Sequence, residues 1–121
     1  MVSLQLDLRS LATHVHTNLV HYNLWTNVQI HNVPANDVVV LSGTPATKLR
    51  PDDADGLTEW VVARSLVTDY SMTTAQINHW FSTIESLHGT RPARVTIAIV
   101  NDDGTVVYYF IHDGVVKPRQ N

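Results

Sequence analysis

The chain begins with apolar side chains at steps of three and four residues, whereas Arg9, Thr13 and His16 fall outside this series. Such spacing is typical of an amphipathic helix with one face on a hydrophobic core. We therefore expect a first helix. Its buried stripe is predicted to comprise Leu4, Leu8, Leu11, Ala12, Val15, Leu19 and Tyr22.

Three strands are predicted between residues 25 and 66. β-Branched and aromatic residues, which strands favour, are frequent in the ranges 25–30, 38–41 and 59–66. Residues 42–56 instead carry Gly, Pro and Asp, which favour turns. We expect this segment to be the longest loop, flexible over residues 43–56.

A second helix is predicted between Thr73 and Gly89. Gln76 follows Thr73 at the spacing of a capping box, in which each side chain binds the other residue's backbone amide. Gly89, followed by Pro92, then stops the helix. The apolar positions at helical spacing are Ile77, Trp80, Phe81, Ile84 and Leu87.

The C-terminal part predicts a β-hairpin. Residues 94–100 and 105–112 are rich in Val, Ile and Tyr, and the turn sequence Asn-Asp-Asp-Gly separates them. Both alternating sets of side chains in the first run are largely apolar, as in a central strand covered on both faces. The chain thus indicates helices that flank a hairpin-rich sheet, an α/β fold.

The apolar run at residues 106–111 has three explanations. It is an edge strand that another chain covers, a strand buried in its own subunit, or a strand capped by a helix and a loop. An exposed apolar edge would aggregate unless a second chain paired with it. The pattern alone leaves these explanations open.

Length and composition fit one compact domain over residues 1–121, with a weakly basic tail at 117–121. The net charge of −3 argues against autonomous binding to a nucleic-acid backbone. Cysteine is absent, which excludes disulfides and thiolate metal sites. Asp7 and Arg9 interrupt the apolar N-terminal segment, so we expect no signal peptide, no membrane span and a soluble protein.

The histidines do not predict a metal site or another cofactor. His14 and His16 lie two residues apart, which turns them about 200° from each other on a helix. His21 follows His16 by five residues, which also misses the spacing of helical zinc ligands. No metal or cofactor is therefore expected.

A ribonuclease that acts alone would need a base, an acid and a cation to converge. The residue types are present as Tyr70, as His79 or His88, and as Lys48 or Arg94, but their spacing does not mark them as one unit. A small homodimeric binding module is a further alternative. Cleavage of RNA by the purified chain alone would favour the ribonuclease over the module.

Residues 94–121 resemble the C-terminus of the family of the tRNA-splicing endonuclease subunit numbered fifteen, through the Asn-Asp-Asp-Gly turn and the run Val-Val-Tyr-Tyr-Phe-Ile. Residues 18–30 and 41–49 resemble fungal members of that family. The likeness covers nearly the whole chain. It implies a compact α/β domain with a mixed sheet, like the catalytic domain of tRNA-intron endonucleases.

The resemblance implies a structural, non-catalytic subunit of a heterotetramer that removes introns from precursor tRNA. The direct partner would be the catalytic subunit numbered thirty-four, and the compartment the nucleus, or the mitochondrial surface in some yeasts. Arg94 stands where a catalytic subunit would be expected to carry a lysine, and no histidine motif is recognisable. Catalysis is therefore not expected in this chain.

Two partner contacts follow from the resemblance. The last strand would pair with its counterpart on the partner subunit, or with a second copy when the chain is isolated. The residues assigned to this strand interface are Val106, Val107, Tyr108, Tyr109, Phe110 and Ile111. The acidic turn before it would dock into a basic groove on the opposite dimer. The residues assigned to this turn are Asn101, Asp102, Asp103 and Gly104.

Overall fold

The computed structural model describes residues 3–31, 39–47, 56–65 and 73–113, with side chains from residue 10 onward. In chain order, the elements are α1 (Ser3–Thr17), the π-helical turn η1 (Asn18–Tyr22), β1 (Thr26–His31), β2 (Val39–Thr44), β3 (Glu59–Ser65), α2 (Thr74–His88), β4 (Arg94–Val100) and β5 (Val106–His112). The basic tail at 117–121 lies outside the described residues.

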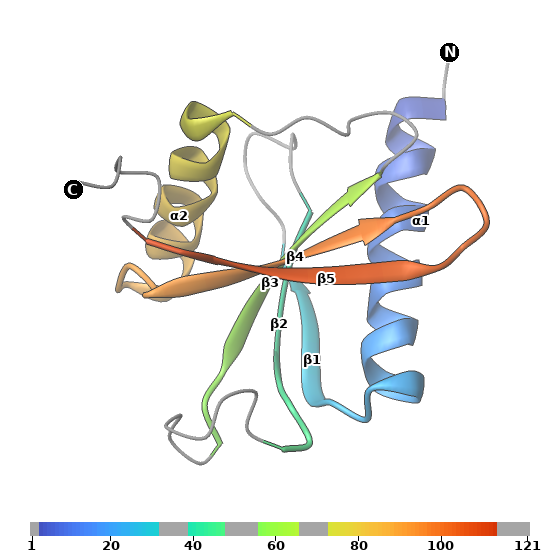
Figure 1. The fold of residues 1–121 in the computed structure, drawn as a ribbon, viewed down its shortest axis with the longest axis horizontal. Coiled ribbons are helices and arrows are strands. Elements are labelled where there is room, and N and C mark those ends of the chain that lie inside the picture. The colour runs from blue at the N-terminus through green and yellow to red at the C-terminus, as the bar shows by residue number, and fades with distance from the viewer. Residues whose placement is uncertain (1–2, 32–38, 48–55, 66–72, 114–121) are drawn as a thin grey trace, which may run out of the picture.

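The five strands form one mixed sheet in the order β1-β2-β3-β4-β5. All neighbours are antiparallel except β3 and β4, which are parallel. Parallel neighbours need a long crossover, and here that crossover contains α2. Figure 1 shows α1 and α2 on opposite sides of the sheet. The predicted α/β architecture of two helices around a mixed sheet is confirmed.

Each helix covers its own hydrophobic cluster. Under α2, Trp80 and Phe81 pack with Val62 of β3. Under α1, Val15 packs with Val61, the next residue of β3. Neighbouring strand residues point to opposite faces, so a strand buried on both sides needs apolar residues in sequence. This explains the continuous apolar content of the central strands.

β4 confirms the prediction of a strand covered on both faces. Val95 and Ile97 belong to the cluster under α2, whereas Ala98 belongs to the cluster under α1. Their exposed fractions are at most 1%. β4 is therefore a central strand, with β3 on one side and β5 on the other.

The local signals for α2 are confirmed. The side chain of Thr73 accepts a hydrogen bond from the amide of Gln76 at 3.1 Å, and the Gln76 side chain accepts one from the amide of Thr73 at 3.0 Å. Gly89 ends the helix in the left-handed conformation, with φ of 95°. This conformation strains residues that carry a Cβ, which explains glycine at this position.

The first helix differs from its prediction at its end. The α-helical geometry stops at Thr17 and continues as the π-helical turn η1. A π turn holds more residues than an α turn, so it rotates the residues that follow it out of the 3.6-residue pattern. Leu19 is 1% exposed, but Tyr22 is 79% exposed. The prediction that Tyr22 lies on the buried stripe is wrong.

The predicted loop begins later than expected. Ser42, Gly43 and Thr44 belong to β2, where Ser42 is the partner of Trp60 and Gly43 of Glu59. A Cβ at Gly43 would lie 3.0 Å from side-chain atoms of both Trp25 and Val28. Glycine is therefore needed here for close packing against these two side chains, and not for a turn. Residues 48–55 of the predicted loop lie outside the described residues.

The two edges of the sheet differ. At one edge, β1 pairs with β2 through an interrupted register, with an irregularity between Thr26 and Gln29. Asn27 within this irregularity has a φ of 55°, a left-handed conformation that is uncommon outside glycine. At the other edge, β5 is regular over its whole length against β4. No helix in the described part of the chain is long and apolar enough to cross a membrane.

Candidate functional site

β5 has one paired edge and one open edge. It pairs with β4 from Arg94 opposite His112 to Val100 opposite Val106. On its other side, no strand within the described part of the chain pairs with it. An open edge presents backbone N–H and C=O groups that can pair with a strand of another chain. β5 is therefore the candidate docking strand.

Three side chains of the predicted interface are anchored in the subunit's own core. Val106 and Tyr108 pack against the cluster under α1, and Ile111 packs against the cluster under α2. The Tyr108 hydroxyl also donates a hydrogen bond of 2.6 Å to the side-chain oxygen of Asn18. Burial raises the pKa of Tyr108 to about 12. These contacts fix the strand to the domain.

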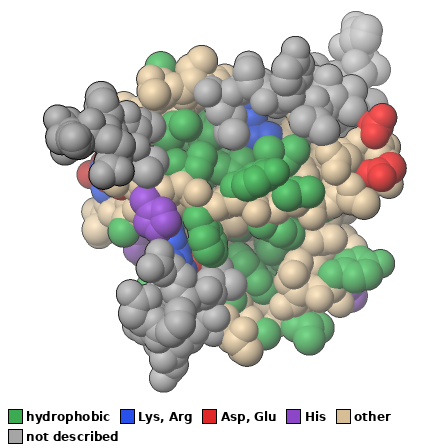
Figure 2. All heavy atoms as spheres, viewed as in Figure 1, with side chains coloured by type: hydrophobic (Ala, Val, Ile, Leu, Met, Phe, Trp, Pro, Cys, Tyr) green, Lys and Arg blue, Asp and Glu red, His purple; other side chains and the backbone are tan. Residues whose placement is uncertain are grey.

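The other three side chains of the predicted interface face solvent. Val107, Tyr109 and Phe110 are 41%, 53% and 41% exposed. Figure 2 shows apolar side chains gathered on the side of the molecule where β5 lies in Figure 1. Val107 and Tyr109 lie on the face of the sheet that α2 covers, and Phe110 lies on the opposite face. Exposed apolar groups of this size mark interaction surfaces in proteins. The open backbone edge and the exposed apolar side chains therefore coincide on one strand.

An ion pair supports this surface from within the sheet. The guanidinium of Arg94 in β4 binds the carboxylate of Glu59 in β3, and their side chains are 10% and 3% exposed. The same guanidinium lies 4.8 Å from the centre of the Phe110 ring. A cation over an aromatic face attracts the ring electrostatically. Arg94 therefore holds Phe110 at the surface of β5.

The turn between β4 and β5 is closed by its own hydrogen bonds. The amide of Asn101 donates to the carbonyl of Thr105 at 2.8 Å, and the amide of Gly104 donates to the carbonyl of Asn101 at 3.0 Å. Gly104 has a φ of 93°, which favours glycine at this position. The predicted hairpin and its turn residues are confirmed as structure.

The two carboxylates of the turn are in different environments. One oxygen of Asp103 accepts hydrogen bonds from the Thr105 amide at 3.1 Å and from the Thr105 hydroxyl at 2.8 Å. The hydrogen bond from the Thr105 amide is the largest cause that lowers the pKa of Asp103, and the hydrogen bond from the Thr105 hydroxyl is the second. Asp102 and Asp103 are both exposed. Asp103 stabilises the turn through its bonds to Thr105, and the Asp102 carboxylate is accessible to a cationic group of a partner.

The turn also contacts the first helix. Nε2 of His14 lies 2.6 Å from the carbonyl oxygen of Gly104, although the two residues are ninety positions apart. The sequence excludes His14 and His16 as a metal-binding pair and gives no sign of the contact of His14 with the turn, because that contact depends on the fold. Within the described residues, no three His, Asp or Glu side chains are grouped as in a metal site.

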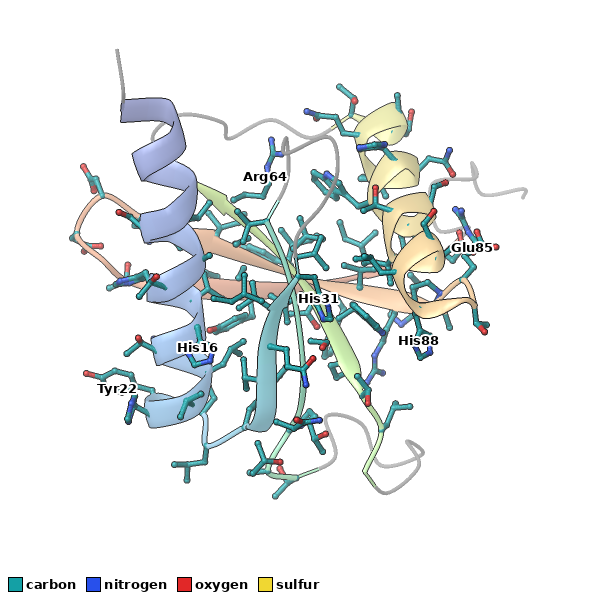
Figure 3. All side chains as sticks on the ribbon, turned by 180° about the vertical axis from the view of Figure 1, so that it is seen from behind. His16, Tyr22, His31, Arg64, Glu85 and His88 are labelled. Atoms are coloured by element: carbon teal, nitrogen blue, oxygen red, sulfur yellow. The ribbon has the colours of Figure 1, made fainter. Side chains whose placement is uncertain are left out.

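The structure describes three of the residues considered for an independent ribonuclease. Of these, Arg94 is bound to Glu59. The His88 ring lies against Trp60, with the ring centres 5.4 Å apart. Figure 3 shows His88 at the end of α2. His79 is exposed on α2, whereas Tyr70 and Lys48 lie outside the described residues.

Comparison with known proteins shows one family model and two relatives to which this chain is similar. Residues 14–121 match the family model described as "Sen15 protein". The tRNA-splicing endonuclease subunit SEN15 of Eremothecium gossypii is 38% identical, over 99% of this chain and 98% of the relative. The probable tRNA-splicing endonuclease subunit tsp-1 of Neurospora crassa is 29% identical, over 94% of this chain and 67% of the relative.

Proposed function

The chain belongs to the Sen15 protein family, and from this premise we propose that it is a structural subunit of a tRNA-splicing endonuclease. In this role it contributes to the removal of introns from precursor tRNA by assembling with other subunits. The names of the two relatives, both tRNA-splicing endonuclease subunits, support the assignment. The observation that carries it at the level of structure is the open, apolar edge of β5.

The proposed direct partner is the catalytic subunit numbered thirty-four, which pairs with β5. The unpaired edge supports strand addition, because main-chain hydrogen bonds across a new strand pair give affinity. Val107, Tyr109 and Phe110 add apolar surface that the partner removes from water. In the absence of this subunit, a second copy of the chain takes its place.

The turn at residues 101–104 is the proposed second contact, with a basic groove on the opposite dimer. Asp102 is exposed and supplies a negative charge for such a groove. Asp103 is bound to Thr105 and keeps the turn in shape. Complementary charge at a contact of this kind sets the register and the association rate more than it sets affinity.

The subunit acts on tRNA indirectly, by positioning the active site of its partner. The ion pair of Arg94 with Glu59 supports this assignment, since it commits a cation beside Phe110 of β5 to a structural contact. The proposed compartment is the nucleus, or the mitochondrial surface as in some yeasts. A likeness of the fold to the catalytic domain of tRNA-intron endonucleases belongs to the same proposal.

A cleavage assay tests the proposal. The chain is co-expressed with candidate catalytic subunits, and cleavage of precursor tRNA is measured with and without it. We expect selective co-purification with the catalytic subunit numbered thirty-four, and cleavage only when this chain is present. Cleavage by this chain alone, or full cleavage in its absence, would contradict the proposal.

A matched pair of variants makes the test specific to β5. Tyr109→Lys places a charge on the docking strand and is expected to abolish pairing with the catalytic subunit. Tyr22→Lys makes the same change at a side chain that is 79% exposed on η1, and it is expected to leave pairing unchanged. Figure 3 places Tyr22 at the end of the first helix. Equal pairing by both variants would remove β5 from the interface.

A further inference from the structure

Two hydrogen bonds with the same spacing join the first helix to the β4–β5 hairpin. The first joins Nε2 of His14 to the carbonyl of Gly104 at 2.6 Å. Four residues further along both segments, the hydroxyl of Tyr108 donates to Oδ1 of Asn18, also at 2.6 Å. We infer that His14 and Asn18 are positioning residues, which hold the tip and the outer strand of the hairpin ready for the partner subunit. The inference rests on the proposed function.

The chemistry of the first bond fixes its direction. A backbone carbonyl only accepts hydrogen bonds, so Nε2 of His14 carries the proton and donates. The imidazole also lies close to the backbone of Gly104, because a Cβ built there would be 3.7 Å from its Cε1 atom. The turn therefore rests on the ring as well as accepting its hydrogen bond.

The helix is the fixed side of this contact. Ala12 and Val15, on either side of His14, are 7% and 0% exposed, and Leu19, next to Asn18, is 1% exposed. These side chains belong to the cluster between α1 and the sheet. His14 and Asn18 thus project from a backbone that the core immobilises. Figure 1 shows the turn of the hairpin reaching past α1.

The bonds inside the turn cannot replace this support. Those among Asn101, Asp103, Gly104 and Thr105 define the local shape of the tip. These bonds lie inside the turn and do not join it to the first helix. The His14 bond connects the turn to α1 and supports it from outside.

This support matters for binding through preorganisation. A partner that must order a swinging tip loses part of its interaction free energy to that ordering. A hairpin held in place before the partner arrives avoids the loss. Removing the bond should therefore weaken binding, although His14 itself need not contact the partner.

Two amide substitutions of different length provide the test. In His14→Gln the side-chain amide reaches about as far as Nε2 and keeps a donor, whereas in His14→Asn it is one methylene shorter and falls short of Gly104. Affinity of the full chain for the catalytic subunits is measured by titration. We expect His14→Asn to weaken binding about fivefold, which corresponds to the net contribution of one hydrogen bond. His14→Gln should change the affinity by less than about twofold.

Backbone hydrogen exchange in the isolated chain gives a second readout. The amides of Asn101 and Gly104 should exchange faster in His14→Asn than in His14→Gln, because only the shorter side chain releases the tip. This difference does not depend on the partner. A general loss of stability would instead speed exchange in the core strands as well.

The outcomes separate this inference from the proposed function. If Tyr109→Lys abolishes pairing while both His14 variants bind as the unsubstituted chain does, the docking function stands and the positioning role is overturned. Equal weakening by Asn and Gln also overturns it, since the donor would then be irrelevant. If Tyr109→Lys has no effect on pairing, the proposed docking through β5 fails, and the positioning role that rests on it fails as well.

Discussion

Glu59 and Arg94 form an ion pair across the parallel strands β3 and β4, with side chains that are 3% and 10% exposed. The two residues are 35 positions apart in sequence. Little water reaches the pair, so each charge depends on the other for its stabilisation. The guanidinium also supports Phe110 on β5, which links the interior of the sheet to its surface.

We predict that breaking this pair on one side destabilises the domain strongly. Arg94→Met should lower the free energy of unfolding by about 3–5 kcal/mol, because it leaves the Glu59 carboxylate buried without a counter-charge. Urea unfolding of the isolated chain measures the change. The double variant with Glu59→Met is expected to recover most of the loss. A double variant as unstable as Arg94→Met would mean that the pair itself contributes net stability.

The Tyr108 hydroxyl yields a second prediction. Tyr108→Phe removes the hydrogen bond to Asn18 and should lower the free energy of unfolding by about 1 kcal/mol. The raised pKa of about 12 also predicts a loss of stability as pH rises. The unfolded chain loses this proton near its usual pKa of 10.0, so the loss begins there and continues up to about pH 12.

Alkaline titration of the tyrosine absorbance measures this effect. One tyrosine should ionise near pH 12 in the unsubstituted chain, and that step should be missing in Tyr108→Phe. The substituted chain should also lose less stability between pH 10 and 12. A titration curve that the substitution does not change would contradict the assignment.

His31 predicts a response to acid. Its Nε2 lies 2.8 Å from the Ser42 hydroxyl, its ring centre lies 5.0 Å from that of Trp60, and burial lowers its pKa below the usual 6.5. Below pH 6.5 the unfolded chain therefore binds a proton that the folded chain resists. This contribution to stability is complete above pH 6.5 and declines as pH falls toward the lowered pKa.

Urea unfolding at pH 7.5 and pH 5 tests the response. The decrease in unfolding free energy between these values should be smaller in His31→Gln than in the unsubstituted chain. His21→Gln, a change at an exposed histidine, serves as the matched control and should keep the full decrease. The same pH dependence in all three proteins would refute the role of His31.

The isolated chain is predicted to form a homodimer through β5. An open edge with exposed apolar side chains pairs with any compatible edge, and a second copy offers one. Light scattering over a range of concentrations should show a dimer that Tyr109→Lys converts to a monomer and that Tyr22→Lys leaves intact. A monomer at every concentration would contradict the prediction.

Most of the fold could be predicted from signals between residues that are close in sequence. The capping box of Thr73 and Gln76 determines where α2 begins, and the residues that make it are adjacent in sequence. The hairpin likewise follows from a short turn between two apolar runs, which the register of β4 and β5 confirms. Interactions of this kind depend little on the rest of the chain, so the sequence suffices to predict them.

The errors arose where distant residues decide the structure. Gly43 has the sequence signature of a turn, yet it lies in β2 because Trp25 and Val28 pack against it. Tyr22 is a local exception: it fits the helical stripe, yet it ends a π-helical turn, which changes the periodicity. The contacts of His14 with Gly104 and of Glu59 with Arg94 were also missed, since no pattern in the sequence relates these pairs.

The irregular β1 edge has a consequence for the size of any assembly. A strand that adds to a sheet needs a regular row of backbone groups, and the interruption between Thr26 and Gln29, with Asn27 at φ of 55°, breaks that row. Polymerisation by edge addition requires two receptive edges, whereas the described part of the chain offers one, at β5. If partners add at β5, growth would stop after one neighbour, which favours closed assemblies of fixed stoichiometry over filaments.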